Sequence, residues 1–188
     1  MKHSILAIEL CLRLDGGDSV RDELRRLVLA HPAATSPGYK SDLLRRVTQV
    51  LAENSERFAM GCWDFFDDDQ RALKDYDMWC KGMITEEGAR TEPSGSGTSD
   101  DPRFLTFTVA LLLVQGSDGE RALARLCETS DEETWHKATF LKILNGLGEV
   151  DYGAVKSDVL YLIPGDTSWG LTRDDLQQVK FEYLRPVS

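Results

Sequence analysis

Residues 104–114 constrain the fold more than any other segment of this chain. Their sequence, FLTFTVALLLV, is rich in β-branched and aromatic side chains, and apolar residues occupy both of its alternating faces. Such residues favour strands, and a strand that is apolar on both faces is typical of a buried position. We therefore expect this segment to form a central strand of a sheet.

Residues 5–14 and 159–163 are two further expected strands. In the first of them, leucine and isoleucine fill the even positions from residue 6, whereas Glu9 and Arg13 fall among the odd positions. This alternation is typical of a strand with one solvated face. The first strand needs a partner, and the other strands come much later in the chain. We expect residues 5–14 to pair beside residues 104–114.

Apolar residues at helical spacing predict about six helices. The six begin near Ser19, Ser36, Asp69, Gly119, Ser130 and Thr172. Residues 58–66 separate two of these helices and are interpreted as a mixed aromatic connection. The predicted order is β-α-α-α-linker-β-α-α-β-α, in which about six helices cover one face of a small three-stranded sheet. This is an α+β fold.

Residues 88–103 differ from the rest of the chain in composition. Positions 92–102 are mostly Gly, Ser, Thr, Pro and acidic residues, and they contain no large apolar side chain. Segments of this composition form flexible linkers or long loops. Because the strands before and after this loop have to share one sheet, we expect residues 1–188 to form a single domain.

The charge of the chain argues against a nucleic-acid partner. Its 188 residues include 32 acidic and 22 basic side chains, for a formal net charge of −10, and a negative field repels phosphate. The pairs Arg25-Arg26 and Arg45-Arg46 are interpreted as solvated helix residues. The longest apolar run, residues 109–114, is far shorter than the roughly 20 residues that cross a bilayer. We expect no membrane segment.

The four cysteines have no paired spacing. In a chain large enough to fold without disulfides, this pattern predicts reduced thiols and a cytoplasmic location. The cysteines and histidines also lack the close spacing of zinc ligands. Asp151 stands where the Gly-x-Gly of residues 146–148 needs a third glycine to bind a dinucleotide. We therefore predict a protein with no catalytic residue, no cofactor and no metal, which is not an enzyme.

An acidic cluster from Asp64 to Asp69 supports an alternative hypothesis. Two or three converging carboxylates bind a hard cation such as Mg²⁺ or Ca²⁺. The alternative is a small divalent-cation-dependent hydrolase or ligand-binding enzyme that uses this cluster. The structural explanation is a helix N-terminus, where acidic side chains interact favourably with the helix dipole.

Trp63, Phe65 and Phe66 place three large aromatic side chains between two predicted helices, and Trp169 lies in a predicted turn. Aromatic residues in a connection either pack helices onto the core or anchor a partner. In the absence of a catalytic pattern, we predict a soluble interaction, regulatory or accessory protein. It would bind another protein through these four residues, and core packing is the alternative.

Several segments together resemble a known family. TSPG leading into DLLRRV, the Trp63 region, the strand segment 104–114, and VLYLIP followed by LTRDDL occur in this order along the chain. In order and spacing they resemble a poorly characterised bacterial and plastid family of unknown function that includes the chloroplast fluctuating-light acclimation protein. The resemblance implies a regulatory or scaffolding role and brings no catalytic residues to carry over. The chain departs from the family at residues 163–166, IPGD, where members have a Thr-Pro-Gln-like turn.

Overall fold

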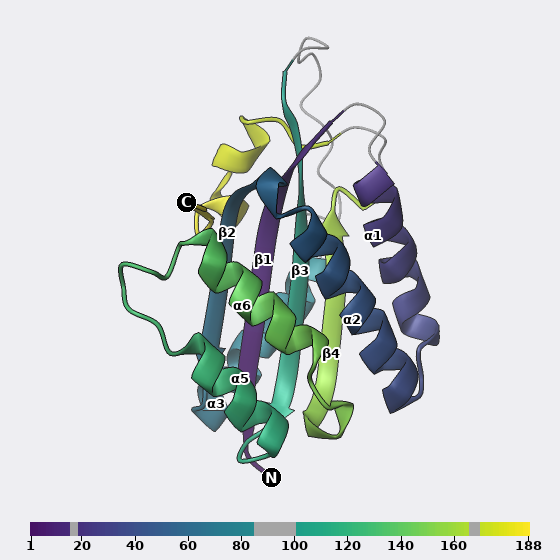
Figure 1. The fold of residues 1–188 in the computed structure, drawn as a ribbon, viewed down its shortest axis with the longest axis vertical. Coiled ribbons are helices and arrows are strands. Elements are labelled where there is room, and N and C mark those ends of the chain that lie inside the picture. The colour runs from purple at the N-terminus through teal and green to yellow at the C-terminus, as the bar shows by residue number, and fades with distance from the viewer. Residues whose placement is uncertain (16–18, 85–100, 166–169) are drawn as a thin grey trace.

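The computed structural model describes residues 1–15, 19–84, 101–165 and 170–188 (Figure 1). Their fold is α+β, as the sequence predicts, and contains one five-stranded antiparallel sheet in the order β4-β3-β1-β2-β5. The strands are β1 (His3–Leu14), β2 (Phe58–Phe66), β3 (Arg103–Val114), β4 (Val155–Ile163) and β5 (Arg185–Pro186). β1 lies in the middle of the sheet, and β4 and β5 form its edges.

β1 and β3 pair along their whole length, from His3 opposite Val114 to Leu14 opposite Arg103. This confirms the expected pairing of the first strand with the apolar run. The pairing brings together residues on both sides of the predicted flexible loop at residues 88–103. Of that loop, the part up to residue 100 lies outside the described residues.

The prediction of three strands is wrong, because residues 58–66 form β2 and not an aromatic connection. β2 pairs with β1 from Phe58 to Phe66, and the short strand formed by Arg185 and Pro186 pairs with its other side. Aromatic side chains of β2 occur on both faces of the sheet. The segment therefore lacks the one-sided apolar alternation by which a strand is recognised in a sequence.

Helices cover both faces of the sheet, whereas the sequence predicted cover on one face only (Figure 1). One face carries α1 (Ser19–Ala30), α2 (Pro37–Glu53), α5 (Asp118–Cys127) and α6 (Lys137–Gly148). The opposite face carries α3 (Asp69–Ile84), where Ala72 packs with Ile5, Ala7 and Cys11 of β1. We call this second face the α3 face. Cover from both sides explains why β3 is apolar on both of its faces.

Five α-helices occur among the described residues, where about six were predicted. The segment that begins at Ser130 is a turn, and α6 starts only after it. Thr172 leads into two 3₁₀ turns, Asp175–Gln177 and Val179–Phe181. Gln178 between these turns has extended backbone angles, so an α-helix cannot continue through it. Within the described ranges, no helix has both the length and the apolar character needed to cross a membrane.

Gly61 determines how closely α6 approaches β2. A Cβ atom added at this glycine would lie 2.6 Å from a ring carbon of Phe140, which is well inside van der Waals contact. Phe140 is completely buried. The missing side chain at Gly61 therefore lets the Phe140 ring pack directly on the backbone of β2.

Candidate functional site

A row of four residues crosses the centre of the sheet on the α3 face. Cys62 of β2 lies opposite Glu9 of β1. Glu9 in turn lies opposite Thr108 of β3, and Thr108 lies opposite Tyr161 of β4. Residues directly opposite each other on adjacent strands project from the same face of a sheet. The four side chains, which we call the Glu9 row, therefore project together toward the layer that contains α3.

Glu9 is buried, with only 1 % of its surface exposed. The prediction of a solvated face at this position is wrong, because α3 and the C-terminal segment cover it. The Tyr183 hydroxyl donates a hydrogen bond of 2.7 Å to Oε2 of Glu9. Within the described residues, Oε1 of Glu9 and the hydroxyl oxygens of Thr106 and Thr108 form no well-aligned hydrogen bond, although both hydroxyls lie close enough to Glu9 to lower its pKa. Buried polar atoms without a partner are rare in folded proteins and destabilise them.

The burial of this cluster changes the ionisation of its members. Burial raises the pKa of the Glu9 carboxyl, and the hydroxyls of Tyr183 and the two nearby threonines only partly offset this. Burial also raises the pKa of Tyr183, and the neighbouring Glu9 adds to the effect. Tyr183 therefore remains a neutral hydroxyl at neutral pH. Burial raises the pKa of Cys62 to about 12, and nearby carboxylates add to the rise, so this thiol is not ionised at neutral pH.

A pocket of about 480 Å³ opens on the α3 face beside this row. Cys62 and Tyr161, the two ends of the Glu9 row, line the pocket together with Tyr183. Further lining residues come from β2, from α3 and from the C-terminal segment: Asp64, Phe66, Arg71, Asp75, Met78, Trp79 and Lys180. Glu9 lies between Cys62 and Tyr161 in the row, so it is close to the pocket, although it is buried and does not line the pocket itself.

Aromatic rings and one guanidinium group form much of the pocket wall. The rings of Trp79 and Tyr183 meet edge to face, with centroids 6.0 Å apart and planes at 83°. The Arg71 guanidinium carbon lies 3.3 Å from the centroid of the Phe66 ring. Arg71 also forms an ion pair of 3.5 Å with Asp75, one turn further along α3. These two contacts hold the charge of Arg71 in place.

Asp64 is a carboxylate in the pocket wall without a contact partner. Among the described residues it forms no hydrogen bond and no ion pair, and Arg71 acts on it only as a nearby charge. Burial raises the pKa of Asp64 more than Arg71 lowers it, and the neighbouring Asp75 adds to the rise. The pocket therefore disfavours the bare carboxylate form of Asp64.

The structure separates the four aromatic residues that the sequence singled out. Phe66 packs on the α3 face and lines the pocket. Trp63 and Phe65 pack on the opposite face, against the cluster beneath α5 and α6, and the Trp63 indole donates a hydrogen bond of 3.0 Å to the Thr134 carbonyl. Trp169 lies outside the described residues. A protein-binding role for these residues stays a prediction.

The acidic residues from Asp64 to Asp69 do not converge. Asp68 accepts a hydrogen bond of 2.9 Å from the backbone N–H of Arg71 at the start of α3. Asp69 accepts one of 2.7 Å from the backbone N–H of His3, whereas Asp64 faces the pocket. In the part of the chain that the structure describes, no three His, Cys, Asp or Glu residues are placed to hold a metal ion.

A second buried carboxylate lies on the other face of the sheet, at edge strand β4. Asp158 contacts Nε2 of His31 at 2.5 Å, accepts a hydrogen bond of 3.2 Å from the Tyr152 hydroxyl, and pairs with Lys40. Burial alone raises the pKa of Asp158, but hydrogen bonds from His31 and Lys40 outweigh it and hold the pKa below its usual range. Both oxygens of Asp158 are thus partnered, and the cluster ties the α1–α2 connection to β4.

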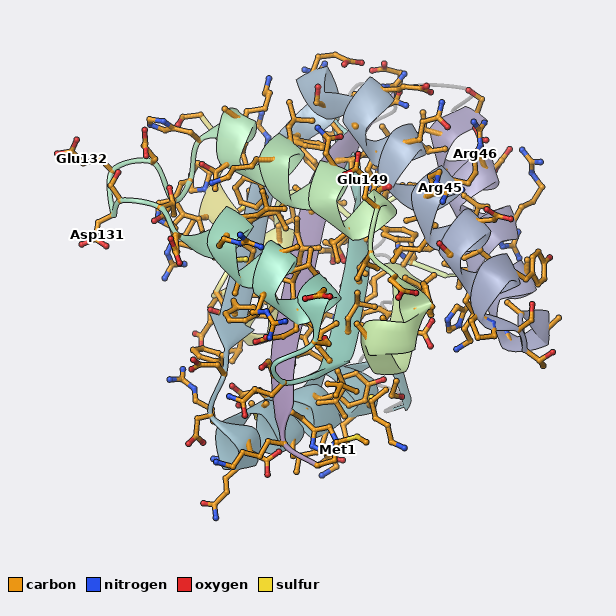
Figure 2. The ribbon with its side chains drawn as sticks, turned by 60° about the horizontal axis from the view of Figure 1, so that its bottom comes forward. Met1, Arg45, Arg46, Asp131, Glu132 and Glu149 are labelled. Atoms are coloured by element: carbon orange, nitrogen blue, oxygen red, sulfur yellow. The ribbon has the colours of Figure 1, made fainter. Side chains whose placement is uncertain are left out.

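The basic pair on α2 is solvated, as the sequence indicates. Figure 2 shows Arg45 and Arg46 on the outer side of this helix. Arg45 forms an ion pair of 2.7 Å with Asp42, and Arg46 pairs with Glu23 of α1. These carboxylates offset the positive charge of both arginines.

Sequence reasoning missed Glu9 and Tyr183. One signal for Glu9 was available, because it is the only acidic or basic residue between Ser4 and Leu12 in a strand of otherwise apolar or small side chains. No comparable signal marks Tyr183. The two residues are 174 positions apart in the chain, and only the fold brings them together.

Comparisons of the chain with family models, with curated proteins and with solved structures find no match. The resemblance to the bacterial and plastid family stays a prediction.

Proposed function

We propose that this protein binds a small organic ligand in the pocket on the α3 face, and that it acts as a non-enzymatic binding or accessory protein. Glu9 carries the proposal. It is a buried carboxyl with one unpartnered oxygen, and it lies between two residues that line an aromatic pocket. Ligand sites are typically concave and largely apolar, with a few convergent polar groups whose pKa values are often perturbed.

The size and the opening of the pocket support this proposal. Its volume of about 480 Å³ falls within the range of about 300 to 1,000 Å³ that is usual for small-molecule sites. Met78 and Tyr183 at the pocket are partly exposed, at 54 % and 37 %. The pocket is therefore open to solvent at these two residues.

The chemistry of the pocket supports binding over catalysis. Nucleophilic catalysis needs an activated nucleophile, usually with a base at hydrogen-bond distance. The Cys62 thiol stays protonated at neutral pH because burial raises its pKa to about 12, and no histidine is among the described lining residues. The accessory role predicted from the sequence is kept in this proposal, with a small molecule as the bound species.

The proposal is tested by fluorine NMR on protein labelled with 5-fluorotryptophan. The chain contains four tryptophans, and single Trp→Phe variants assign their resonances. In a screen of small aromatic and amphipathic compounds, we expect binders to shift the resonance of Trp79, which lines the pocket.

Trp63 provides the matched control, because it packs on the opposite face of the sheet. Its resonance should not move when a pocket ligand binds. A screen in which no compound shifts the Trp79 resonance overturns the proposal. So does a set of binders that all shift Trp63 and leave Trp79 unchanged.

A further inference from the structure

We infer that the ligand of this pocket is an organic cation, a primary or quaternary ammonium group attached to an apolar body. This inference rests on the proposed function and adds the chemical class of the ligand. It follows from three features of the pocket: carboxyl groups without a cationic partner, basic groups that are already engaged, and aromatic walls.

Two carboxyl groups at the pocket lack a cationic partner within the described residues. Asp64 in the wall forms neither a hydrogen bond nor an ion pair. Glu9, next to the lining residues Cys62 and Tyr161, accepts a well-aligned hydrogen bond from Tyr183 and has no cationic partner. A cation bound beside Asp64 would compensate the burial that raises the pKa of this carboxyl, since buried charges are normally paired.

The basic residues at the pocket do not fill this role. Arg71 stacks on Phe66 at 3.3 Å and pairs with Asp75 at 3.5 Å, so it acts on Asp64 only as a nearby charge and does not contact it. The ammonium of Lys180 lies 5.2 Å from the centroid of the Phe181 ring. Neither group forms an ion pair with Asp64 in the described structure.

The walls of the pocket favour an organic cation over a metal ion. Trp79, Tyr161, Tyr183 and Phe66 all line it, and a cation within about 6 Å of an aromatic centroid is attracted by the negative face of the ring. A metal ion needs several close protein ligands, and the described residues contain no such group of three. An anionic ligand would meet repulsion from Asp64, whereas the charge of Asp75 is offset by its ion pair with Arg71.

Four probes that share one phenylethyl body test the inference. They are 2-phenylethylamine, its N,N,N-trimethyl derivative, 2-phenylethanol and phenylacetate. Titration of each probe against the fluorine resonance of Trp79 gives its Kd. We expect both ammonium probes to bind at least about tenfold more tightly than 2-phenylethanol, and phenylacetate to bind most weakly.

Asp64→Asn identifies the group responsible for this preference. We expect the variant to bind 2-phenylethanol as the wild-type protein does, and to lose most of its preference for the ammonium probes. Asp77→Asn is the matched control, because Asp77 is an exposed aspartate of α3 that pairs with Lys81. This variant should keep the preference. Circular dichroism and a melting curve confirm that both variants are folded.

Equal binding of the alcohol and the amines, or tighter binding of phenylacetate, overturns the inference and leaves the pocket proposal standing. An unchanged preference in Asp64→Asn also overturns it. If none of the four probes shifts Trp79 but other library compounds do, the ligand class is wrong. If no compound of any class shifts Trp79, both proposals fail.

Discussion

The hydroxyl of Tyr183 donates a hydrogen bond of 2.7 Å to Oε2 of Glu9, across 174 positions of the chain. Glu9 belongs to the central strand β1, and Tyr183 precedes edge strand β5. The bond therefore links the buried middle of the sheet to the segment that closes the α3 face. Because Tyr183 also lines the pocket, a single side chain connects the pocket wall to the buried Glu9 carboxyl.

Replacing Glu9 by glutamine should change how stability depends on pH. Burial raises the pKa of Glu9 above its ordinary value of 4.5. Its stabilising contribution is thus fully present below about pH 4.5 and is lost as the pH rises through the folded-state pKa. In that window the free energy of unfolding falls by up to about 1.4 kcal/mol per pH unit. We expect this decline in the wild-type protein and not in Glu9→Gln, measured by urea unfolding from about pH 5 to pH 8. Parallel pH profiles for the two proteins would contradict the assignment.

Tyr183→Phe should destabilise the protein by about 1 to 3 kcal/mol, because it leaves the buried Glu9 carboxyl without its donor. The same change should raise the pKa of Glu9, since the Tyr183 hydroxyl lowers it. Tyr39→Phe is the control, because Tyr39 is 48 % exposed, and its effect should stay within about 0.5 kcal/mol. Chemical denaturation gives the free energy of unfolding of both variants. If Tyr183→Phe and Tyr39→Phe lose equal amounts, the Tyr183 hydroxyl does not stabilise the buried Glu9 carboxyl.

Trp63 variants test whether this residue is part of the core or an anchor for a protein partner. Its indole donates to the Thr134 carbonyl at 3.0 Å and packs against the main core. Trp63→Phe should cost about 1 kcal/mol for the lost hydrogen bond, and Trp63→Ala about 3 kcal/mol for the lost packing. Thermal melts measure both. If the melting temperature of Trp63→Ala is unchanged, Trp63 is not part of the core, and its predicted role as an anchor for a protein partner is favoured.

Asp158→Asn should destabilise the protein by about 3 kcal/mol at neutral pH, because the variant leaves the partly buried Lys40 and His31 without their buried carboxylate partner. The pKa of Asp158 lies below its ordinary value of 3.8. Its contribution is thus present above about pH 4 and is lost as the pH falls toward the folded-state pKa. The difference between wild type and variant should shrink below about pH 4.

Asp42→Asn is the control for Asp158→Asn. It removes the exposed ion pair with Arg45, and exposed pairs contribute only about 0 to 1 kcal/mol. Urea unfolding of both variants across this pH range provides the comparison. A loss in Asp158→Asn no larger than that in Asp42→Asn would mean that the buried cluster does not hold the α1–α2 connection onto β4.

Gly61→Ala should destabilise the contact between β2 and α6 by about 1 to 3 kcal/mol, the usual cost of overpacking. The added methyl group would lie 2.6 Å from the ring of Phe140. Gly38→Ala in the first turn of α2 meets nothing within 4 Å, and it should be neutral or stabilising by up to about 1 kcal/mol. If Gly61→Ala proves as stable as Gly38→Ala, the packing assigned to Phe140 is wrong.

Local patterns in the sequence account for the α+β class, for the strands β1, β3 and β4, and for most of the helices. The pairing of β1 with β3 was also predictable, because an apolar strand without nearby partners has to pair with another apolar strand. Of the pocket residues, the sequence singled out Phe66 as a candidate protein anchor and Asp64 as part of a candidate cation cluster. These features depend on side-chain periodicity within a single segment, which a sequence displays directly.

Tertiary structure alone decided that residues 58–66 form a strand, that Glu9 is buried, and that Tyr183 reaches it. Whether a polar residue faces water depends on what covers that side of the sheet, and here the cover comes from α3 and from the last residues described. The contact between Glu9 and Tyr183 spans 174 positions, and the local pattern of apolar and polar residues around either residue does not indicate it. The candidate site therefore forms only when β1, β2, β4, α3 and the C-terminal segment pack together. The reason is that burial depends on which layers cover a residue in the folded protein and not on its neighbours in the sequence.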